Sequence, residues 1–186
     1  MILQRFFNEV FIEEIYKPIR ELGDLGVVID LGATTGEFSL WVYNQAVEVY
    51  AIEADIRAYE HLRMNVEDFP RIFPKYLAIA GENGTRQLSD NAIGGKSIAH
   101  PKGDATDIEC KTLATFIREE KIDKIDCLKI DVEDAEKEIF EAKDFPEVAG
   151  KIKYIIGEHL EPSKSILEAN GFDFGVYKHG QIAKRK

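Results

Sequence analysis

A turn containing two glycines is the first feature of this 186-residue chain that could bind a ligand. The apolar residues 27–29 lead through Asp30 into the turn, which contains Gly32 and Gly36. Without a Cβ, Gly32 lets a ligand lie against the backbone, and Gly36 frees the start of a helix whose N–H groups and dipole face that ligand. A second apolar run, 47–52, ends in Glu53, which is placed to bind both hydroxyls of a ribose. The two segments together predict one half of a mononucleotide site.

The number of glycines favours one class of nucleotide over another. A dinucleotide fingerprint has a third glycine, at which the backbone approaches a pyrophosphate, whereas this turn has two. The Asp30 carboxylate would repel phosphates but suits a cationic amino-acid head group, such as that of S-adenosylmethionine. The sequence therefore favours S-adenosylmethionine over NAD. An NAD-dependent oxidoreductase is one alternative, and a turn that binds nothing is another.

A second motif and its order relative to the first carry a family resemblance. The segment reads Leu128-Lys129-Ile130-Asp131-Val132-Glu133-Asp134-Ala135-Glu136. The chain resembles the FkbM-like S-adenosylmethionine-dependent methyltransferases, in which D-x-G-A-x-x-G opens the domain and L-K-x-D-V-E-G-A-E follows the fourth strand. Two shorter segments are also similar to that family, namely Ala78-Ile79-Ala80 with Gly84-Thr85, and Thr112-Leu113. The resemblance covers residues 27–174.

This resemblance implies a Rossmann-like class I methyltransferase fold of the α/β class and S-adenosylmethionine as the cofactor. It also implies O-methylation of a small molecule or a glycan, the expected partner of the protein. The residues expected to bind the cofactor are Asp30, Gly32, Ala33, Gly36, Glu53, Ala54 and Ala80. Asp134 stands where the family usually has glycine, and Ala114 where an aspartate often follows. These two departures favour a further alternative, a non-catalytic cofactor-binding or interaction module.

Residues that follow the predicted strands are the candidates for catalysis. In open α/β sheets ligands lie outside the carboxyl ends of the strands, so the side chains there are expected to converge on one crevice: Asp30, Glu53, Asp131, Glu158 and His159. Methyl transfer from a sulfonium is an in-line displacement that needs alignment, and it needs a base only if the acceptor is a hydroxyl. We expect Asp131 to orient the acceptor or take its proton, and His159 to be the general base, with a purely structural role as its alternative. Glu158 could hold the imidazole of His159 in one tautomer. These oxygen and imidazole ligands lack a diagnostic metal spacing, so no metal is predicted.

Apolar and polar periodicities predict alternating strands and helices after an N-terminal helix. Strands are expected near 27–31, 47–53, 74–80, 126–131, 153–158 and 172–178. Helices are expected near 37–46, 55–67, 112–121, 135–143 and 163–169. This alternation predicts a mostly parallel sheet with helices on both faces. Gly180, between two strand-like segments, predicts a C-terminal antiparallel hairpin that closes the sheet with an antiparallel edge strand.

Three other segments carry expectations of their own. Residues 81–107, which are rich in glycine, form a candidate substrate loop, with a surface hairpin as the alternative. Four glutamates after the second motif are expected to form a solvated helix face: Glu133, Glu136, Glu138 and Glu141. Cys110 and Cys127 have neither metal nor redox spacing and are expected to be buried thiols.

Composition bounds the size and the partners of the protein. The chain is 45% hydrophobic, which suits one methyltransferase domain over residues 1–186, with 1–26 as a helical extension. A net charge of -10 argues against nucleic-acid binding. The apolar start carries charges at helical spacing, so neither a signal peptide nor a membrane span is expected, and a cytoplasmic location follows. The apolar face of that first helix could cover the domain itself or pack on a second copy in a homodimer.

Overall fold

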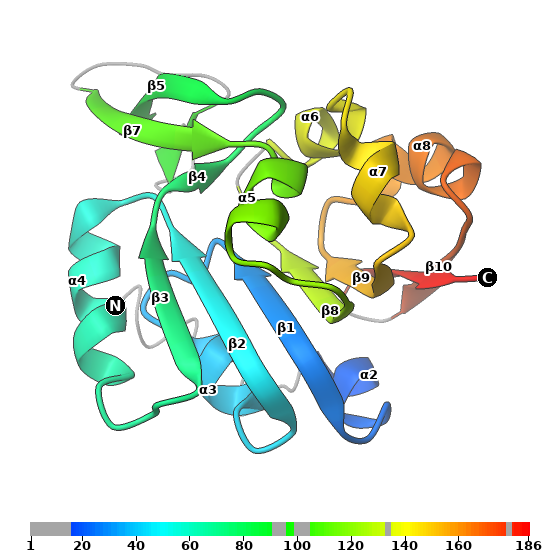
Figure 1. Cartoon of the computed structure of the whole chain (residues 1–186), viewed down its shortest axis with the longest axis horizontal. Coiled ribbons are helices and arrows are strands. Elements are labelled where there is room, and N and C mark those ends of the chain that lie inside the picture. Colours follow the sequence, from blue (N-terminus) through cyan, green and yellow to red (C-terminus); the bar gives the residue numbers. More distant parts are fainter. Residues whose placement is uncertain (1–15, 91–95, 99–104, 133–134, 178–179) are drawn as a thin grey trace.

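A seven-stranded sheet forms the centre of the computed structural model, which describes residues 16–90, 96–98, 105–132, 135–177 and 180–186 (Figure 1). The strand order is β10-β11-β9-β8-β1-β2-β3. The strands are β1 (Leu25–Leu31), β2 (Ala46–Glu53), β3 (Ile72–Tyr76), β8 (Ile125–Ile130), β9 (Ile152–Gly157), β10 (Phe172–Tyr177) and β11 (Gly180–Arg185). The pairs from β3 to β9 are parallel, and β11 is antiparallel to both of its neighbours. The expected mostly parallel sheet is thus confirmed, while residues 1–15 of the helical extension expected at 1–26 lie outside the described residues.

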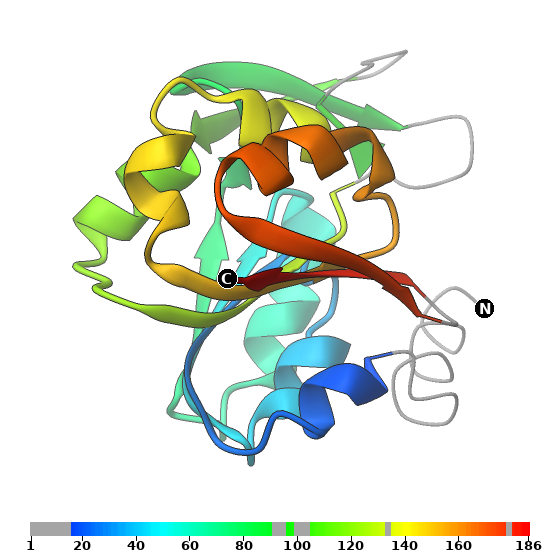
Figure 2. The same ribbon diagram turned by 90° about the vertical axis from the view of Figure 1, so that its right-hand side faces the viewer.

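Helices cover both faces of this sheet (Figure 2). One face carries α2 (Lys17–Arg20), α3 (Glu37–Val42) and α4 (Ile56–Asn65). The other face carries α5 (Leu113–Glu119), α6 (Glu136–Glu141), α7 (Phe145–Ala149), the short helix η2 (Glu161–Ser163) and α8 (Lys164–Ala169). Of these, α7 has no counterpart among the expected helices. Across these described ranges, no helix has both the length and the hydrophobicity needed to cross a bilayer.

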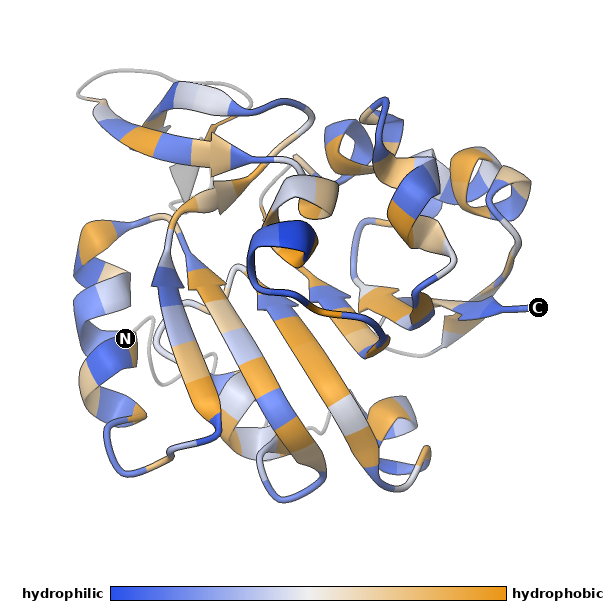
Figure 3. Ribbon diagram, in the orientation of Figure 1, coloured by the Kyte–Doolittle hydropathy of each residue, from blue (hydrophilic) through white to orange (hydrophobic). Residues whose placement is uncertain are grey.

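The strands are apolar on both sides because each face is covered. Val28 packs in the cluster beneath α3, whereas Ile29 and Leu31 pack in the cluster beneath α5. All six residues of β8 are buried, including the polar Asp126 and Lys129, and most of β1 is coloured as hydrophobic (Figure 3). Successive side chains of a strand point to opposite faces, so strands that are covered on both sides are mostly apolar. The two helical layers therefore account for the continuous apolar runs in the sequence.

A second, four-stranded sheet includes the described parts of the segment 81–107, where antiparallel strands agree with the hairpin alternative. Its strands are β4 (Ala78–Ile79), β5 (Gly84–Asp90), β6 (Lys96–Ser97) and β7 (Thr106–Lys111), in the order β4-β7-β5-β6. A role of the segment 81–107 in substrate binding stays a prediction, and residues 91–95 and 99–104 lie outside the described residues. The single strand expected at 74–80 breaks at Leu77, because β3 pairs with β2 whereas β4 pairs with β7. In β7, Ile108 and Cys110 are buried while Glu109 between them is exposed, the alternation of a sheet with one covered face. Cys110 and Cys127 are both buried free thiols, as expected.

The C-terminal hairpin is present, but its antiparallel strand is not at the edge. β11 lies between β9 and β10, and β10 is the outer strand. Burial explains this order, since Ala183 of β11 is fully buried whereas Val176 of β10 is 71% exposed. The expectation of an antiparallel edge strand was therefore wrong, because a sequence pattern identifies a hairpin without showing which of its strands enters the sheet.

A hydrogen-bond network fixes the start of α5 beneath the second sheet. Thr112 Oγ1 accepts a hydrogen bond from the Thr115 N–H at 3.1 Å and donates one to Asp144 Oδ2 at 2.7 Å. The Thr112 N–H donates to Asn83 Oδ1 at 2.9 Å. Thr112 thus caps one helix while binding the residue that precedes α7.

We expect Thr112→Ala to destabilise the protein by about 1–3 kcal/mol, because it removes the cap and leaves a half-buried carboxylate with one fewer donor. Thr112→Ser keeps the hydroxyl and is the matched control. Urea denaturation of the two variants measures the difference. Equal stabilities for the alanine and serine variants would show that the hydroxyl contributes nothing.

Candidate cofactor and active site

The strand order brings the predicted site residues to one edge of the central sheet. β9, β8, β1 and β2 are neighbours, and all four run in the same direction. Glu53 ends β2, Asp131 follows β8, and Glu158 and His159 follow β9. Asp131 is partly exposed, whereas Glu158 and His159 are exposed. The topology therefore gathers these side chains at the carboxyl ends of adjacent strands.

The turn after β1 is folded tightly against the ends of β2 and β8. The N–H groups of Gly32 and Ala33 both donate to the Ile52 carbonyl, at 3.0 and 2.9 Å. Gly32 has a φ of +74°, and a Cβ there would lie 1.9 Å from the Asp131 carbonyl oxygen. Packing of the protein's own backbone thus requires glycine at this position, whether or not a ligand binds there. Ala33, on the same turn, is buried.

Gly36 directly precedes α3, at the helix start where it was expected. It has a φ of +98°, and a Cβ there would lie 2.9 Å from Leu62 Cδ1 of α4. A side chain would therefore strain the backbone and crowd the facing helix at the same time.

Thr34 and Glu53 form a direct link between the turn and β2. Thr34 has a φ of +53°, which is uncommon for a β-branched residue. Its N–H donates to Glu53 Oε2 at 2.8 Å, while the Asp55 N–H donates to Glu53 Oε1 at 2.7 Å. Burial raises the pKa of Glu53 to about 7, although the N–H groups of Asp55 and Thr34 act to lower it. Both carboxylate oxygens retain a lone pair that could accept a hydroxyl proton.

Asp30 lies inside the protein rather than on the surface of the turn. The side chain is fully buried. Its Oδ2 accepts a hydrogen bond from Ser39 Oγ of α3 at 2.7 Å, and its Oδ1 lies 3.2 Å from Lys129 Nζ. A direct contact of Asp30 with a cationic head group stays a prediction.

Lys129 is the residue of this edge whose importance the sequence analysis missed. Its register partner on β1 is Asp30, and its side chain is 5% exposed. The ammonium donates to the Gly32 carbonyl at 2.8 Å and to the Leu31 carbonyl at 3.3 Å, and lies 3.9 Å from Asp131 Oδ2. A lysine between the apolar residues Leu128 and Ile130 of a buried strand was a signal in the sequence, since buried lysines require a counter-ion.

Glu136 corrects the expectation of a solvated glutamate face. It is 3% exposed, and its Oε1 accepts a hydrogen bond from the Val132 N–H at 3.0 Å. Burial raises its pKa, while His159 lowers it electrostatically. Glu138 is partly buried, and Arg86 of β5 donates to it at 2.6 Å. Of the remaining two, Glu141 is exposed as expected, and Glu133 lies outside the described residues.

A side chain of β11 holds the segment that follows β9. Gln181 Oε1 accepts hydrogen bonds from the N–H groups of Leu160 and Glu161, at 2.5 and 2.8 Å. These two residues come directly after His159, so the amide limits the movement of the exposed pair Glu158 and His159. Within the described ranges, no group of three or more His, Cys, Asp or Glu residues could hold a metal ion.

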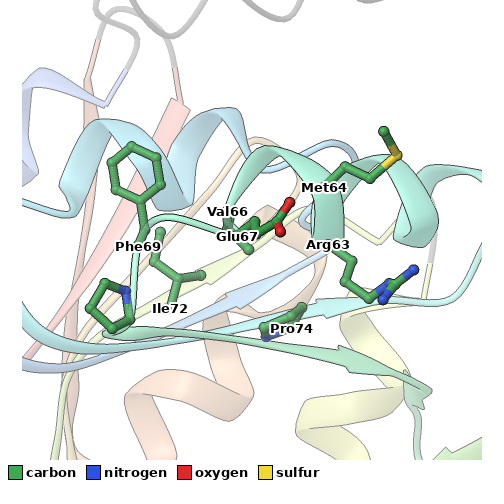
Figure 4. Close-up of a pocket in the computed structure, with 8 residues that line it drawn as sticks. Arg63, Met64, Val66, Glu67, Phe69, Ile72 and Pro74 are labelled. Carbon is green, nitrogen blue, oxygen red and sulfur yellow. The ribbon is translucent and has the colours of Figure 1, made fainter.

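The structure has a small hollow next to the carboxyl ends of the central strands and a larger one away from them. The small apolar one, of about 40 Å³, lies between the two sheets and is lined by residues of the turn, β2, β4 and β5, among them Gly32, Ala54, Ala78 and Leu88. Ala80 is fully buried in the same apolar cluster as Ala54. The larger hollow, of about 460 Å³, lies between the C-terminal end of α4 and β3 and is lined by Met64, Phe69 and Pro74, among others (Figure 4). Because α4 runs back along the sheet, this larger hollow lies away from the carboxyl ends of the strands.

The parallel sheet, its antiparallel inner strand and the turn after β1 define a Rossmann-like methyltransferase fold. The family model for the methyltransferase FkbM domain matches residues 30–183, nearly the whole chain. The chain belongs to this methyltransferase family, and the resemblance noted in its sequence is confirmed.

Solved structures share the fold at low sequence identity. The FkbM methyltransferase from Methylobacillus flagellatus KT has a TM-score of 0.61 and 14% identity over 84% of this chain and 42% of that protein. TrmK from M. capricolum, crystallised with S-adenosylhomocysteine, has a TM-score of 0.52 and 13% identity over 91% of this chain and 67% of that one. A precorrin-6y C5,15-methyltransferase from Geobacter metallireducens GS-15 has a TM-score of 0.51 and 15% identity over 88% and 81%. The chain thus spans less than half of the first of these proteins, and no curated protein matches the sequence.

The raised pKa of Glu53 predicts a pH-dependent stability. The carboxyl is protonated in the folded protein up to about pH 7 but ionises near pH 4.5 when unfolded, so the folded state binds more protons between these values. The free energy of unfolding should therefore fall, by about 2–3 kcal/mol, as the pH rises through this window. Glu53→Gln should remove that part of the decline. Urea denaturation at pH 4.5 and pH 8 measures it, and an equal decline in both proteins would contradict the prediction.

Proposed function

We propose that this protein binds S-adenosylmethionine at the turn after β1 and transfers its methyl group to a hydroxyl of a small molecule or a glycan. The observation that carries the proposal is the Glu53 carboxylate, held at the end of β2 by the Thr34 N–H at 2.8 Å. This contact places a pair of acceptor oxygens beside the turn that leads into α3. A ribose with two free hydroxyls suits these oxygens.

The described residues fit each part of this cofactor. Glu53 would bind the ribose, and the apolar residues that line the hollow beside Ala54 and Ala78 would offer a surface against which a planar ring could pack. Ala80 contributes to the apolar cluster behind that hollow. Gly32, Ala33 and Gly36 would bring the backbone close to the amino-acid end. When bound, the cofactor supplies a methyl group on a sulfonium that is already activated for displacement.

On the acceptor side, the chain's own groups would orient and deprotonate a hydroxyl. Asp131 lies at the end of β8, partly exposed, where it could orient the acceptor hydroxyl or accept its proton. His159, exposed after β9, is the second candidate base, and Glu158 next to it could fix its tautomer. Gln181 would keep this pair in place through its hydrogen bonds to the following backbone.

The alternatives differ in how well the observations support them. Membership of the FkbM family does not favour an NAD-dependent oxidoreductase. The family match does not favour a non-catalytic module either. Of the two departures on which that alternative rests, Ala114 is buried in α5 and Asp134 lies outside the described residues. The net charge of -10 favours a small molecule or a glycan over a nucleic acid as the acceptor. A cytoplasmic location and a homodimer stay predictions.

S-adenosylmethionine and S-adenosylhomocysteine should each raise the melting temperature, and NAD should not. At 100 times its dissociation constant a ligand adds about 2.7 kcal/mol, which corresponds to several degrees for a chain of this length. Glu53→Ala should weaken binding by about 1–3 kcal/mol through the lost hydroxyl contacts. Glu48→Ala, which alters the amino end of the same strand, is the matched control. A shift with NAD alone would refute the proposed cofactor.

Asp131→Asn should separate chemistry from cofactor binding. It keeps the shape of the side chain while removing its charge, so turnover should fall about a hundredfold while the affinity for S-adenosylhomocysteine changes a few-fold at most. His159→Ala should show the same pattern if the imidazole is the base. Calorimetry with S-adenosylhomocysteine gives the affinity, and its release in the presence of hydroxyl acceptors gives the turnover. A parallel loss of affinity would place the altered residue in the cofactor site instead.

A further inference from the structure

A cluster of three charges, two of them buried, lies beneath the turn after β1. Asp30, Lys129 and Asp131 come from neighbouring strands, and the ammonium lies 3.2 Å from Asp30 Oδ1 and 3.9 Å from Asp131 Oδ2. Asp30 is fully buried and the Lys129 side chain is 5% exposed, whereas that of Asp131 is 31% exposed. Only Asp131 thus reaches the solvent-facing side of this edge, and the cluster of two carboxylates and one ammonium has one net negative charge.

The protonation of Lys129 follows from its surroundings. Burial by itself lowers its pKa, but the carboxylates of Asp30 and Asp131 act in the opposite direction and leave that pKa raised. Burial also raises the pKa of Tyr16, so its phenol is neutral. The ammonium donates to the carbonyls of Leu31 and Gly32 and forms an ion pair with Asp30. Its charge is therefore fixed in place, because water and mobile ions cannot replace these partners.

A ligand on the turn would feel this cluster strongly. The Gly32 carbonyl is 2.8 Å from the ammonium, so an atom in contact with that oxygen lies within roughly 7 Å of the ammonium. The two carboxylates lie 3.2 and 3.9 Å from the same ammonium. Charges at such a separation interact appreciably when one of them is buried and poorly screened. S-adenosylmethionine and S-adenosylhomocysteine differ only by a methyl group and the positive charge on sulfur. The field of the cluster acts on the amino-acid end of both ligands alike, but on the sulfur it distinguishes the sulfonium from the uncharged thioether.

We propose that the Asp30–Lys129–Asp131 cluster sets the preference of the site for the sulfonium donor over its neutral product, with Lys129 as the residue that limits this preference and positions the turn. The inference rests on the proposed cofactor. One net negative charge favours the sulfonium, while Lys129 keeps the second carboxylate from adding to it. The product, without the positive charge, loses this attraction once the methyl group has been transferred.

A series of charge variants tests this through the ratio of two dissociation constants, that of S-adenosylhomocysteine over that of S-adenosylmethionine. Lys129→Met adds one net negative charge and should raise the ratio at least about threefold, whereas Asp131→Asn removes one and should lower it by a similar factor. Asp30→Asn with Lys129→Met keeps the net charge, so its ratio should equal that of the parent. General loosening of the site weakens both ligands alike and leaves the ratio unchanged.

Two further proteins keep the test decisive. Lys129→Met leaves Asp30 buried without its counter-ion and is strongly destabilised. If it does not fold, the double variant is compared with the triple variant that adds Asp131→Asn, which should have the lower ratio. Lys151→Met is the matched control, since Lys151 also donates to a backbone carbonyl, that of Ile122 at 3.0 Å. Lys151 precedes β9 at the amino end of the sheet, roughly 16 Å along the strands from Lys129, and its loss should leave the ratio within about twofold.

Isothermal titration calorimetry of each protein with the two pure ligands gives the ratios. A ratio that follows the net charge supports the inference. A constant ratio in a series that binds both ligands overturns it and leaves the proposed cofactor intact. If the parent protein binds neither ligand, the proposed function fails, and the inference fails with it.

Discussion

The contact between the Lys129 ammonium and the Gly32 carbonyl, 2.8 Å long, is the interaction on which the carboxyl edge of the sheet depends. The turn is held from one side by this donor on β8 and from the other by the Ile52 carbonyl of β2, which accepts two of its N–H groups. The Gly32 carbonyl of the turn is thus bound by β8, and two N–H groups of the same turn are bound by β2. Since β1 lies between these strands, the turn cannot move without disturbing the centre of the sheet.

A buried lysine is costly to place in a sheet, and the surrounding residues explain how it is tolerated. Its desolvation is offset by Asp30, which is itself satisfied by Ser39 of α3, so three elements share one network. Removing either charge alone leaves the other buried without a partner. This dependence explains why the network belongs to the fold as much as to the candidate site.

The two sheets have different roles around this edge. The central sheet carries Glu53 and Asp131 at the ends of its strands, where the backbone is fixed by neighbours on both sides. The smaller sheet covers the apolar hollow next to Ala54 and is tied to α6 by the ion pair of Arg86 with Glu138. Polar groups and apolar surface are thereby brought together from separate parts of the chain. This combination is what a ligand with a ribose, a planar ring and a charged end requires.

The sequence by itself determined the family, the alternation of strands and helices and the two motifs at the strand ends. These features are local, because periodicity and a glycine turn are encoded within a dozen residues. Asp131 and Glu53 could be chosen in this way, since each directly ends or follows an apolar run. The burial of Glu136, by contrast, could not be read from its helical spacing.

Only the tertiary structure decided which groups meet. It showed that Lys129 is the register partner of Asp30, that β11 enters the sheet between β9 and β10, and that residues 84–90 and 106–111 pair as strands. Each of these depends on contacts between residues far apart in the chain, whose formation is governed by burial rather than by local propensity. The same distinction applies to position 32. The sequence predicted a glycine turn there, but the reason that no side chain fits is the carbonyl of Asp131, about a hundred residues away in sequence.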